Sequence, residues 1–146
     1  MTEDKDLITY CGLSCEDCFL YKGKIADLSR DLRKELRMVK FDNQAELMSQ
    51  KSFFAVLTNY KQCNEVLGAL VKFRCKRACR GGGPPFCKIR NCCQKRGFEG
   101  CWQCDEFETY AKLESLKPYH GDAQHNNTKK IRKSGIDSFV KMKRSW

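Results

Sequence analysis

The sequence lacks any long hydrophobic run, and no stretch approaches the roughly 20 apolar residues that a membrane-spanning helix needs. This absence predicts a protein without a membrane partner. Residues 1–6 also contain neither the basic region nor the apolar region of a secretory signal peptide. We therefore expect a cytoplasmic protein.

Apolar side chains are scarce as well. The hydrophobic fraction is 41% only because it includes 11 cysteines, and the remaining apolar residues make up about a third of the chain. So small a supply limits the hydrophobic core of a chain of 146 residues. Bound metal would add the missing stability, because a metal site that forms only in the folded state contributes its binding energy to folding.

No segment shows a convincing alternation of apolar and polar residues, and no internal repeat is visible. Apolar residues recur at helical spacing over residues 25–39 and again over residues 43–73, with a break expected near residues 49–52. These patterns predict a mainly α, small metal-stabilised domain, in which helices are joined to an irregular cysteine-rich half with zinc knuckles. We expect one domain over residues 1–146, with residues 117–146 as a basic helical C-terminal extension.

The cysteine-rich half leaves little room for regular structure. A Gly-Gly-Gly-Pro-Pro run at residues 81–85 predicts a turn. A short helix is expected over residues 86–95, ended by Gly97. Asp105 is expected to cap a further helix that Pro118 would stop.

Cysteines are the abundant feature, and ten of the 11 fall into two sets at residues 11–18 and 75–104. Their odd number and the absence of a signal peptide argue against a secreted disulfide scaffold. We therefore expect reduced thiols that bind metal. Cys63 stands alone between the sets, and its neighbours Tyr60 and Leu67 predict a buried free cysteine.

The spacing of the grouped cysteines is typical of metal ligands. Cys15 and Cys18 are separated by two residues, as are Cys101 and Cys104, and this gap lets two sulfurs grip one ion. Adjacent cysteines rarely bind the same ion, so we favour Cys92 over its neighbour Cys93. The nine candidate metal ligands are Cys11, Cys15, Cys18, Cys75, Cys79, Cys87, Cys92, Cys101 and Cys104. His120 and His125 are more simply explained as surface or hydrogen-bonding histidines.

Nine candidates exceed by one the eight thiolates of two tetrahedral zinc sites, so two zinc ions are the favoured cofactor. Eight thiolates with two Zn²⁺ would carry a net charge of −4, reducing the formal charge of the chain from +10 to +6. An iron–sulfur cluster is the alternative, because it uses the same ligands. The spacing of Cys11, Cys15 and Cys18 matches that of radical enzymes, but the chain has neither the length nor the strands of their barrel.

Two basic segments suggest a further class of partner. Residues 72–96 contain nine Lys or Arg and no acidic residue, and residues 129–144 contain seven against one Asp. Such segments can neutralise nucleic-acid phosphates, although the first can also balance the thiolates. A protein partner is equally compatible. The glycines at 81–83 lack the Gly-Lys-Ser/Thr ending of a phosphate-binding P-loop.

In combination the motifs resemble the DUF3795 family of small prokaryotic cysteine-rich proteins. The resemblance rests on Cys-Gly-Leu-x-Cys-x-x-Cys, Arg-Cys followed by Cys-Arg-Gly-Gly-Gly-Pro-Pro, Cys-Lys-Ile-Arg-x-Cys-Cys and Gly-Cys-Trp-x-Cys, at residues 11–18, 74–85, 87–93 and 100–104. It implies zinc binding and brings no known reaction. Two departures stand out: Tyr110 occupies a position where members often have a cysteine, and the Cys75–Cys79 gap is one residue longer than the common form.

The favoured function is a structural-zinc binding or adaptor module rather than an enzyme. A metal-dependent enzyme, a redox or metal-handling protein, and a nucleic-acid-binding zinc protein remain alternatives. A catalytic zinc would keep one open coordination position, whereas a structural zinc is closed by four protein ligands.

Overall fold

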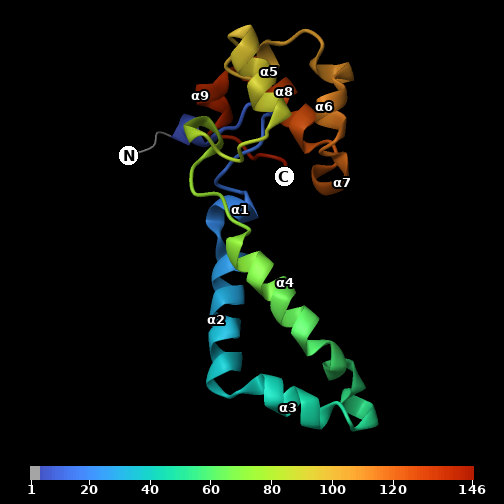
Figure 1. Ribbon diagram of the computed structural model, residues 1–146. Coiled ribbons are helices and arrows are strands. Elements are labelled where there is room, and N and C mark those ends of the chain that lie inside the picture. Colours follow the sequence, from blue (N-terminus) through green and yellow to red (C-terminus); the bar gives the residue numbers. More distant parts are fainter. Residues whose placement is uncertain (1–3) are drawn as a thin grey trace. The chain divides into compact units, whose positions relative to one another are not determined.

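The computed structural model describes residues 4–146, and almost all of its regular structure is helical (Figure 1). Within this range the sole β-type pairing is an isolated antiparallel bridge between Ile8 and Ser14. The prediction of a mainly α fold is confirmed. None of the helices in the described range is both long and apolar enough to cross a membrane.

The chain divides into two compact units. Unit 1 comprises Met1–Tyr21 and Cys75–Trp146, and unit 2 comprises Lys22–Arg74. Unit 1 contains every cysteine except Cys63. The single domain expected over residues 1–146 remains a prediction.

Unit 2 consists of three α-helices and one 3-10 helix. They are α2 (Lys24–Met38), α3 (Phe41–Met48), the 3-10 helix η2 (Ser52–Asn59) and α4 (Tyr60–Lys72). The two predicted helical regions are therefore confirmed, with the expected break falling between α3 and η2. A further short helix, α1 (Phe19–Lys22), precedes α2.

Helices α2 and α4 pack on each other, but the buried side of α2 is not the apolar stripe that the sequence predicts. The Nε of Arg33 donates a hydrogen bond to Asn64 of α4 at 3.3 Å. The buried residues of α2 are Ala26 and Ser29, which share the side of Arg33 at helical steps. The apolar stripe predicted from residue 25 onward is instead partly open to solvent, and Leu28 is 59% exposed.

Two further expectations for unit 2 are wrong. Cys63 is exposed rather than buried. Phe53, expected on the inner apolar face, is 85% exposed. Other residues of the predicted inner face are packed as expected: Leu57, Tyr60 and Leu67 are half-buried, and the ring of Tyr60 packs edge-on against that of Phe41, at 5.0 Å between centroids.

Unit 1 is built from many short helices connected by loops. The α-helices are α5 (Lys88–Arg96), α6 (Ala111–Glu114), α7 (Lys117–His120), α8 (Ala123–Ser134) and α9 (Ile136–Phe139). The 3-10 helices are η1 (Asp4–Leu7), η3 (Cys79–Gly81), η4 (Cys101–Gln103) and η5 (Phe107–Thr109).

The local predictions for unit 1 are mixed. Helix α5 ends as expected at Gly97, which adopts a left-handed conformation with φ of 70°. The single helix expected between Asp105 and Pro118 is wrong, because the chain forms η5 and α6 there and Pro118 lies at the start of α7. Proline is tolerated in a first helical turn, where its missing N–H has no intrahelical acceptor.

The core of unit 1 joins its two chain segments. One cluster consists of Ile8, Trp102, Ile131 and Phe139. The other surrounds Cys93, Cys101 and Cys104, together with Ile89, Phe107 and Leu113. Because Ile131 and Phe139 come from residues 117–146, the C-terminal helices contribute to the core of this unit.

Candidate metal centre

The first cysteine set lies on a loop that folds back on itself. The amide of Cys15 donates to the carbonyl of Leu7 at 2.8 Å, and the amide of Thr9 donates to that of Leu13 at 2.8 Å. A turn then follows, closed by a hydrogen bond from the amide of Cys18 to the carbonyl of Cys15 at 3.0 Å. Cys15 is buried as a result.

The pair Cys101 and Cys104 forms a matching turn. The amide of Cys104 donates to the carbonyl of Cys101 at 3.0 Å, as the amide of Cys18 does to Cys15. Both two-residue gaps therefore give the same local geometry. Their assignment as zinc knuckles remains a prediction.

A first group of thiols gathers around Cys15. The amide of Cys79 donates a hydrogen bond to the Sγ of Cys15 at 3.3 Å, across 64 positions in the sequence. The pKa of Cys15 is raised to about 11, chiefly by burial and to a lesser extent by the neighbouring thiols of Cys79, Cys18 and Cys75. The pKa of Cys75 is likewise raised by burial and by Cys18 and Cys79. These four thiols thus share one electrostatic environment.

A second group gathers around Cys101. Its Sγ lies 3.8 Å from the Sγ of Cys93, and both residues are buried. The hydrogen bond between them lowers the pKa of Cys93 and raises that of Cys101. Charge on Cys11 or Cys104 would also raise the pKa of Cys101, so these two thiols belong to the same neighbourhood.

Cys87 lies at the start of α5, where its Sγ accepts a hydrogen bond from the amide of Arg90 at 3.5 Å. Charge on Cys87 contributes to the raised pKa of both Cys11 and Cys79. Cys87 is therefore close to members of both groups.

Arg90 is a buried cation, with only 6% of its surface exposed. Its Nη2 donates to the carbonyl of Pro84 at 2.7 Å, and its Nη1 to that of Cys79 at 3.5 Å. Within the described residues it pairs with no carboxylate. A buried charge requires compensation, and the Arg90 guanidinium lowers the pKa of Cys79 against the larger effect of burial.

Cys92 faces a different environment from Cys93. It is half-buried and lines a surface cavity with residues of α5 and α6. Its thiol lies near Tyr110, whose pKa is raised by burial and then by Cys92. The position where family members often have a cysteine is thus directly beside a thiol that the sequence had favoured as a ligand.

The two histidines lie away from these thiol contacts. The ring of His120 packs edge-on against Trp146, at 4.7 Å between centroids, and burial lowers its pKa. The Nε2 of His125 lies 3.7 Å from a carboxylate oxygen of Glu114.

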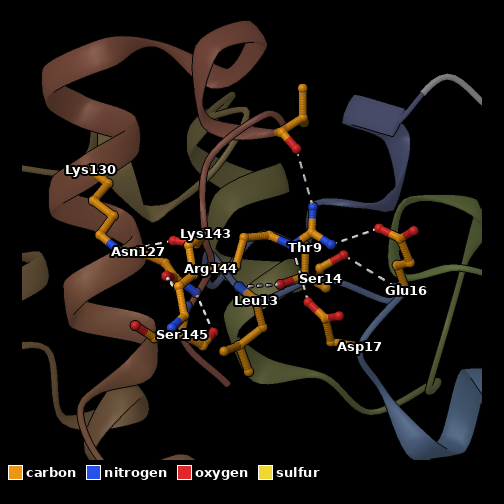
Figure 2. A network of polar contacts seen from close by, with 11 residues as sticks. Thr9, Leu13, Ser14, Glu16, Asp17, Asn127, Lys130, Lys143, Arg144 and Ser145 are labelled. Atoms are coloured by element: carbon orange, nitrogen blue, oxygen red, sulfur yellow. Dashed lines mark hydrogen bonds and ion pairs between the residues drawn. The ribbon is translucent and has the colours of Figure 1, made fainter.

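Arg144 fixes the loop between Cys15 and Cys18 from outside (Figure 2). Its Nη2 donates to Glu16 at 2.6 Å and its Nε to Asp17 at 3.0 Å, while its Nη1 donates to the carbonyl of Val140 at 3.3 Å. The neighbouring Ser145 exchanges two hydrogen bonds with Asn127 of α8, which anchors the tail. The C-terminal segment therefore supports the first cysteine turn.

Sequence patterns contain no clear signal for three arginines that make several contacts within unit 1. Arg80, Arg90 and Arg144 all lie in the two basic segments and there resemble their neighbours. Arg80 donates to the carbonyls of Ile8 at 2.7 Å and Glu99 at 2.8 Å, and its guanidinium lies over the ring of Tyr10. Only contacts between distant segments distinguish these arginines from solvated ones.

Among residues 4–146, no three side chains of His, Cys, Asp or Glu are arranged as a group that could hold a metal ion. The donor chemistry nevertheless suits a thiophilic metal. Burial raises the pKa of several of these thiols, which makes their free thiolates costly, and a cation would remove that cost. The many cysteines are thus compatible with metal binding.

A sequence comparison assigns the chain to a family. Residues 7–114 match the family described as "Protein of unknown function (DUF3795)". The chain belongs to the DUF3795 family. The sequence matches no curated protein and no solved structure. The DUF3795 match ends before α7, α8 and α9, although α8 and α9 supply Ile131 and Phe139 to the core.

Proposed function

We propose that this DUF3795 protein is a zinc-binding module in which two structural zinc ions hold unit 1 together. The observation that carries the proposal is the hydrogen bond from the amide of Cys79 to the Sγ of Cys15. Backbone amides that donate to sulfur stabilise a thiolate, which is the form that binds zinc. The contact also joins the two cysteine sets.

The first ion would be held by Cys15, Cys18, Cys75 and Cys79. The thiols of Cys18, Cys75 and Cys79 all contribute to the raised pKa of Cys15, and the four residues come from both segments of unit 1. A zinc ion there would link the N-terminal loop to the chain that follows unit 2. Closing so long a loop restricts the unfolded chain and adds stability.

The second ion would be held by Cys11, Cys93, Cys101 and Cys104. The thiols of Cys11, Cys93 and Cys104 all influence the pKa of Cys101. In this assignment Cys93 replaces Cys92, which the sequence had favoured. Cys93 is the better ligand because it is buried 3.8 Å from Cys101, whereas Cys92 lines an open cavity.

The buried guanidinium of Arg90 supports anionic sulfur at this centre. Four thiolates around one Zn²⁺ carry a net charge of −2, and a nearby buried cation would balance part of it. The guanidinium of Arg90 donates to the carbonyl of Cys79, and the backbone amide of Arg90 donates to the Sγ of Cys87. A neutral thiol cluster would offer this cation much less compensation.

An adaptor role is supported by unit 2, which exposes many of its large apolar side chains. They are Ile25, Leu28, Leu32, Met38, Val39, Leu47, Phe53, Val56, Val66 and Phe73. Exposed apolar surface is typical of protein-interaction sites. We therefore place the metal-dependent framework in unit 1 and a protein-binding role in unit 2.

Elemental analysis of anaerobically purified protein tests this function. We expect two zinc ions per chain and no iron. A brown, iron-containing protein would instead indicate an iron–sulfur centre. X-ray absorption spectroscopy adds the ligand count: four sulfurs per zinc support structural sites, whereas an oxygen ligand would indicate an open, catalytic position.

Chelation tests whether zinc holds the fold. Complete removal of metal should abolish the cooperative unfolding transition of unit 1, followed by circular dichroism during a thermal melt. Re-addition of zinc under reducing conditions should restore it. An unchanged melting temperature after complete metal removal would refute the structural role.

A further inference from the structure

A surface cavity of about 610 Å³ lies between helices α5 and α6 of unit 1. Its lining residues are Lys88, Asn91, Cys92, Lys95, Arg96 and Lys112. Four of these six side chains are cationic and none is acidic. The size is within the range of small-molecule sites, which commonly measure about 300–1,000 Å³.

The cations are arranged along one side of α5. Lys88, Cys92 and Lys95 follow each other at steps of three and four residues, so their side chains share a helix face. Lys88 and Lys95 are about 10 Å apart along the axis, given the rise of 1.5 Å per residue. Lys112 contributes from α6, and its Nζ lies 5.2 Å from the centre of the Tyr110 ring, which helps to position it.

In the described part of the chain, most of the positive charge of this cavity has no carboxylate partner. Arg80 and Arg90 in the same segment donate to backbone carbonyls inside unit 1. Among the cavity cations, Arg96 approaches a carboxylate, that of Glu106, at 3.7 Å, and it also donates to the Sγ of Cys104.

Three of the seven cations of the second basic segment pair with carboxylates. Lys129 pairs with Glu108 at 3.0 Å, and Arg132 with Asp105 at 2.6 Å. Arg144 pairs with Glu16 and Asp17, as described above. The cavity instead gathers four cations in one place, and this compact arrangement favours a small anion over a nucleic acid.

We propose that this cavity binds a small ligand that carries two or more adjacent phosphate groups. Phosphate oxygens accept charge-assisted hydrogen bonds from lysine and arginine. The side chains of Lys88 and Lys95 start about 10 Å apart along α5 and are long enough to converge on one ligand, and Lys112 adds a third cation from α6. None of the lining residues is a proposed zinc ligand, although Arg96 also donates to the Sγ of Cys104, and Cys92 remains free in the cavity wall.

Isothermal titration calorimetry of the metal-loaded protein with inorganic tripolyphosphate tests the proposal. We expect saturable binding at one site per chain. The triple variant K88Q/K95Q/K112Q should bind at least about tenfold more weakly, because it removes three of the four cations that would donate charge-assisted hydrogen bonds to the phosphates. The matched control K34Q/K51Q/K61Q removes the same charge from unit 2 and should bind within about twofold of the unmodified protein.

Two outcomes would overturn the proposal. Equal weakening in both triple variants would show a general charge effect, and undetectable binding by the unmodified protein would show that no such site exists. A 12-nucleotide single strand is the second probe: if it binds more tightly than tripolyphosphate, the cavity is part of a nucleic-acid surface instead. The zinc content of every variant is measured in parallel, so that loss of the metal centre is distinguished from loss of the cavity.

Discussion

The Nε of Arg144 donates a hydrogen bond to the carboxylate of Asp17 at 3.0 Å, across 127 positions in the sequence. Asp17 lies between Cys15 and Cys18, and the same guanidinium also binds Glu16. The end of the chain thus determines the conformation of two residues that separate a pair of candidate zinc ligands. With 18% of its side chain exposed, Arg144 is better shielded than most cations of this protein.

Replacing Arg144 by alanine should lower the free energy of unfolding by about 1–3 kcal/mol, because two partly shielded, charge-assisted hydrogen bonds are lost. Urea denaturation of the zinc-loaded protein measures the change. Arg30→Ala is the matched control, since Arg30 also binds two carboxylates at 3.0 Å but is 57% exposed. The control should show a clearly smaller loss, and equal losses would refute a special role for Arg144.

Serine substitutions should separate Cys93 from Cys92. Cys93→Ser removes a proposed ligand of the second ion and should lower the zinc content from two ions to one per chain. Cys92→Ser should retain both ions, because its side chain lines the cavity instead. Elemental analysis of both variants gives the answer. Loss of zinc only in the Cys92 variant would restore the assignment favoured by the sequence.

Zinc uptake should release protons at neutral pH. The pKa of Cys11 and that of Cys15 are each raised to about 11, chiefly by burial, so both thiols are protonated at pH 7 in the metal-free fold. Zinc binds the deprotonated form, and the apparent zinc affinity should therefore rise with pH up to about 11. Calorimetry in buffers with different ionisation enthalpies counts the released protons. A zinc affinity independent of pH between 6 and 9 would contradict this protonation state.

The same raised pKa values should make the metal-free protein less stable as the pH rises, whereas the zinc affinity should increase. Raised pKa values favour the folded form while the thiols are neutral, so their contribution is complete below pH 9. It is lost as the pH rises from 9 to about 11, where deprotonation favours the unfolded chain. Any folded structure that survives chelation should therefore be less stable at pH 11 than at pH 8.

Gly12 should tolerate no side chain. Its φ is +85°, and an added Cβ would lie 2.8 Å from the Oγ1 of Thr128 in α8. Gly12→Ala should therefore destabilise unit 1 by about 2–4 kcal/mol, which combines backbone strain with a steric clash. Gly97→Ala is the control, because φ is +70° there but no atom lies within 4 Å. That variant should lose only about 1–2 kcal/mol, and thermal melts compare the two.

Short-range features of this fold could be predicted from the sequence. The periodicity of residues 25–39 gave α2, and Gly97 gave the end of α5, because helix formation and termination depend on neighbouring residues. The same periodicity failed to identify the packed face of α2. Arg33 of α2 instead binds Asn64 of α4, a contact across 31 positions that local periodicity cannot reveal.

The candidate site likewise combines local features that the sequence predicts with contacts that it does not predict. The cysteine spacing identified the two sets, and both two-residue gaps form tight local turns. The spacing contained no information on which set members approach each other. The contact between Cys15 and Cys79 depends on packing between segments 64 positions apart, and that between Cys93 and Cys101 depends on how α5 and η4 pack. Arg144 was hidden for the same reason, because it binds Glu16 and Asp17 across more than 120 positions.

The division of the chain makes unit 2 an insertion within unit 1. The two ends of the insertion meet where the amide of Cys75 donates to the carbonyl of Leu20 at 2.9 Å, a contact made entirely by residues of unit 1. Residues 22–74 contain none of the proposed zinc ligands. Unit 1 should therefore accept a short glycine-rich linker, or an unrelated helical hairpin, in their place, and should keep all of its proposed zinc ligands.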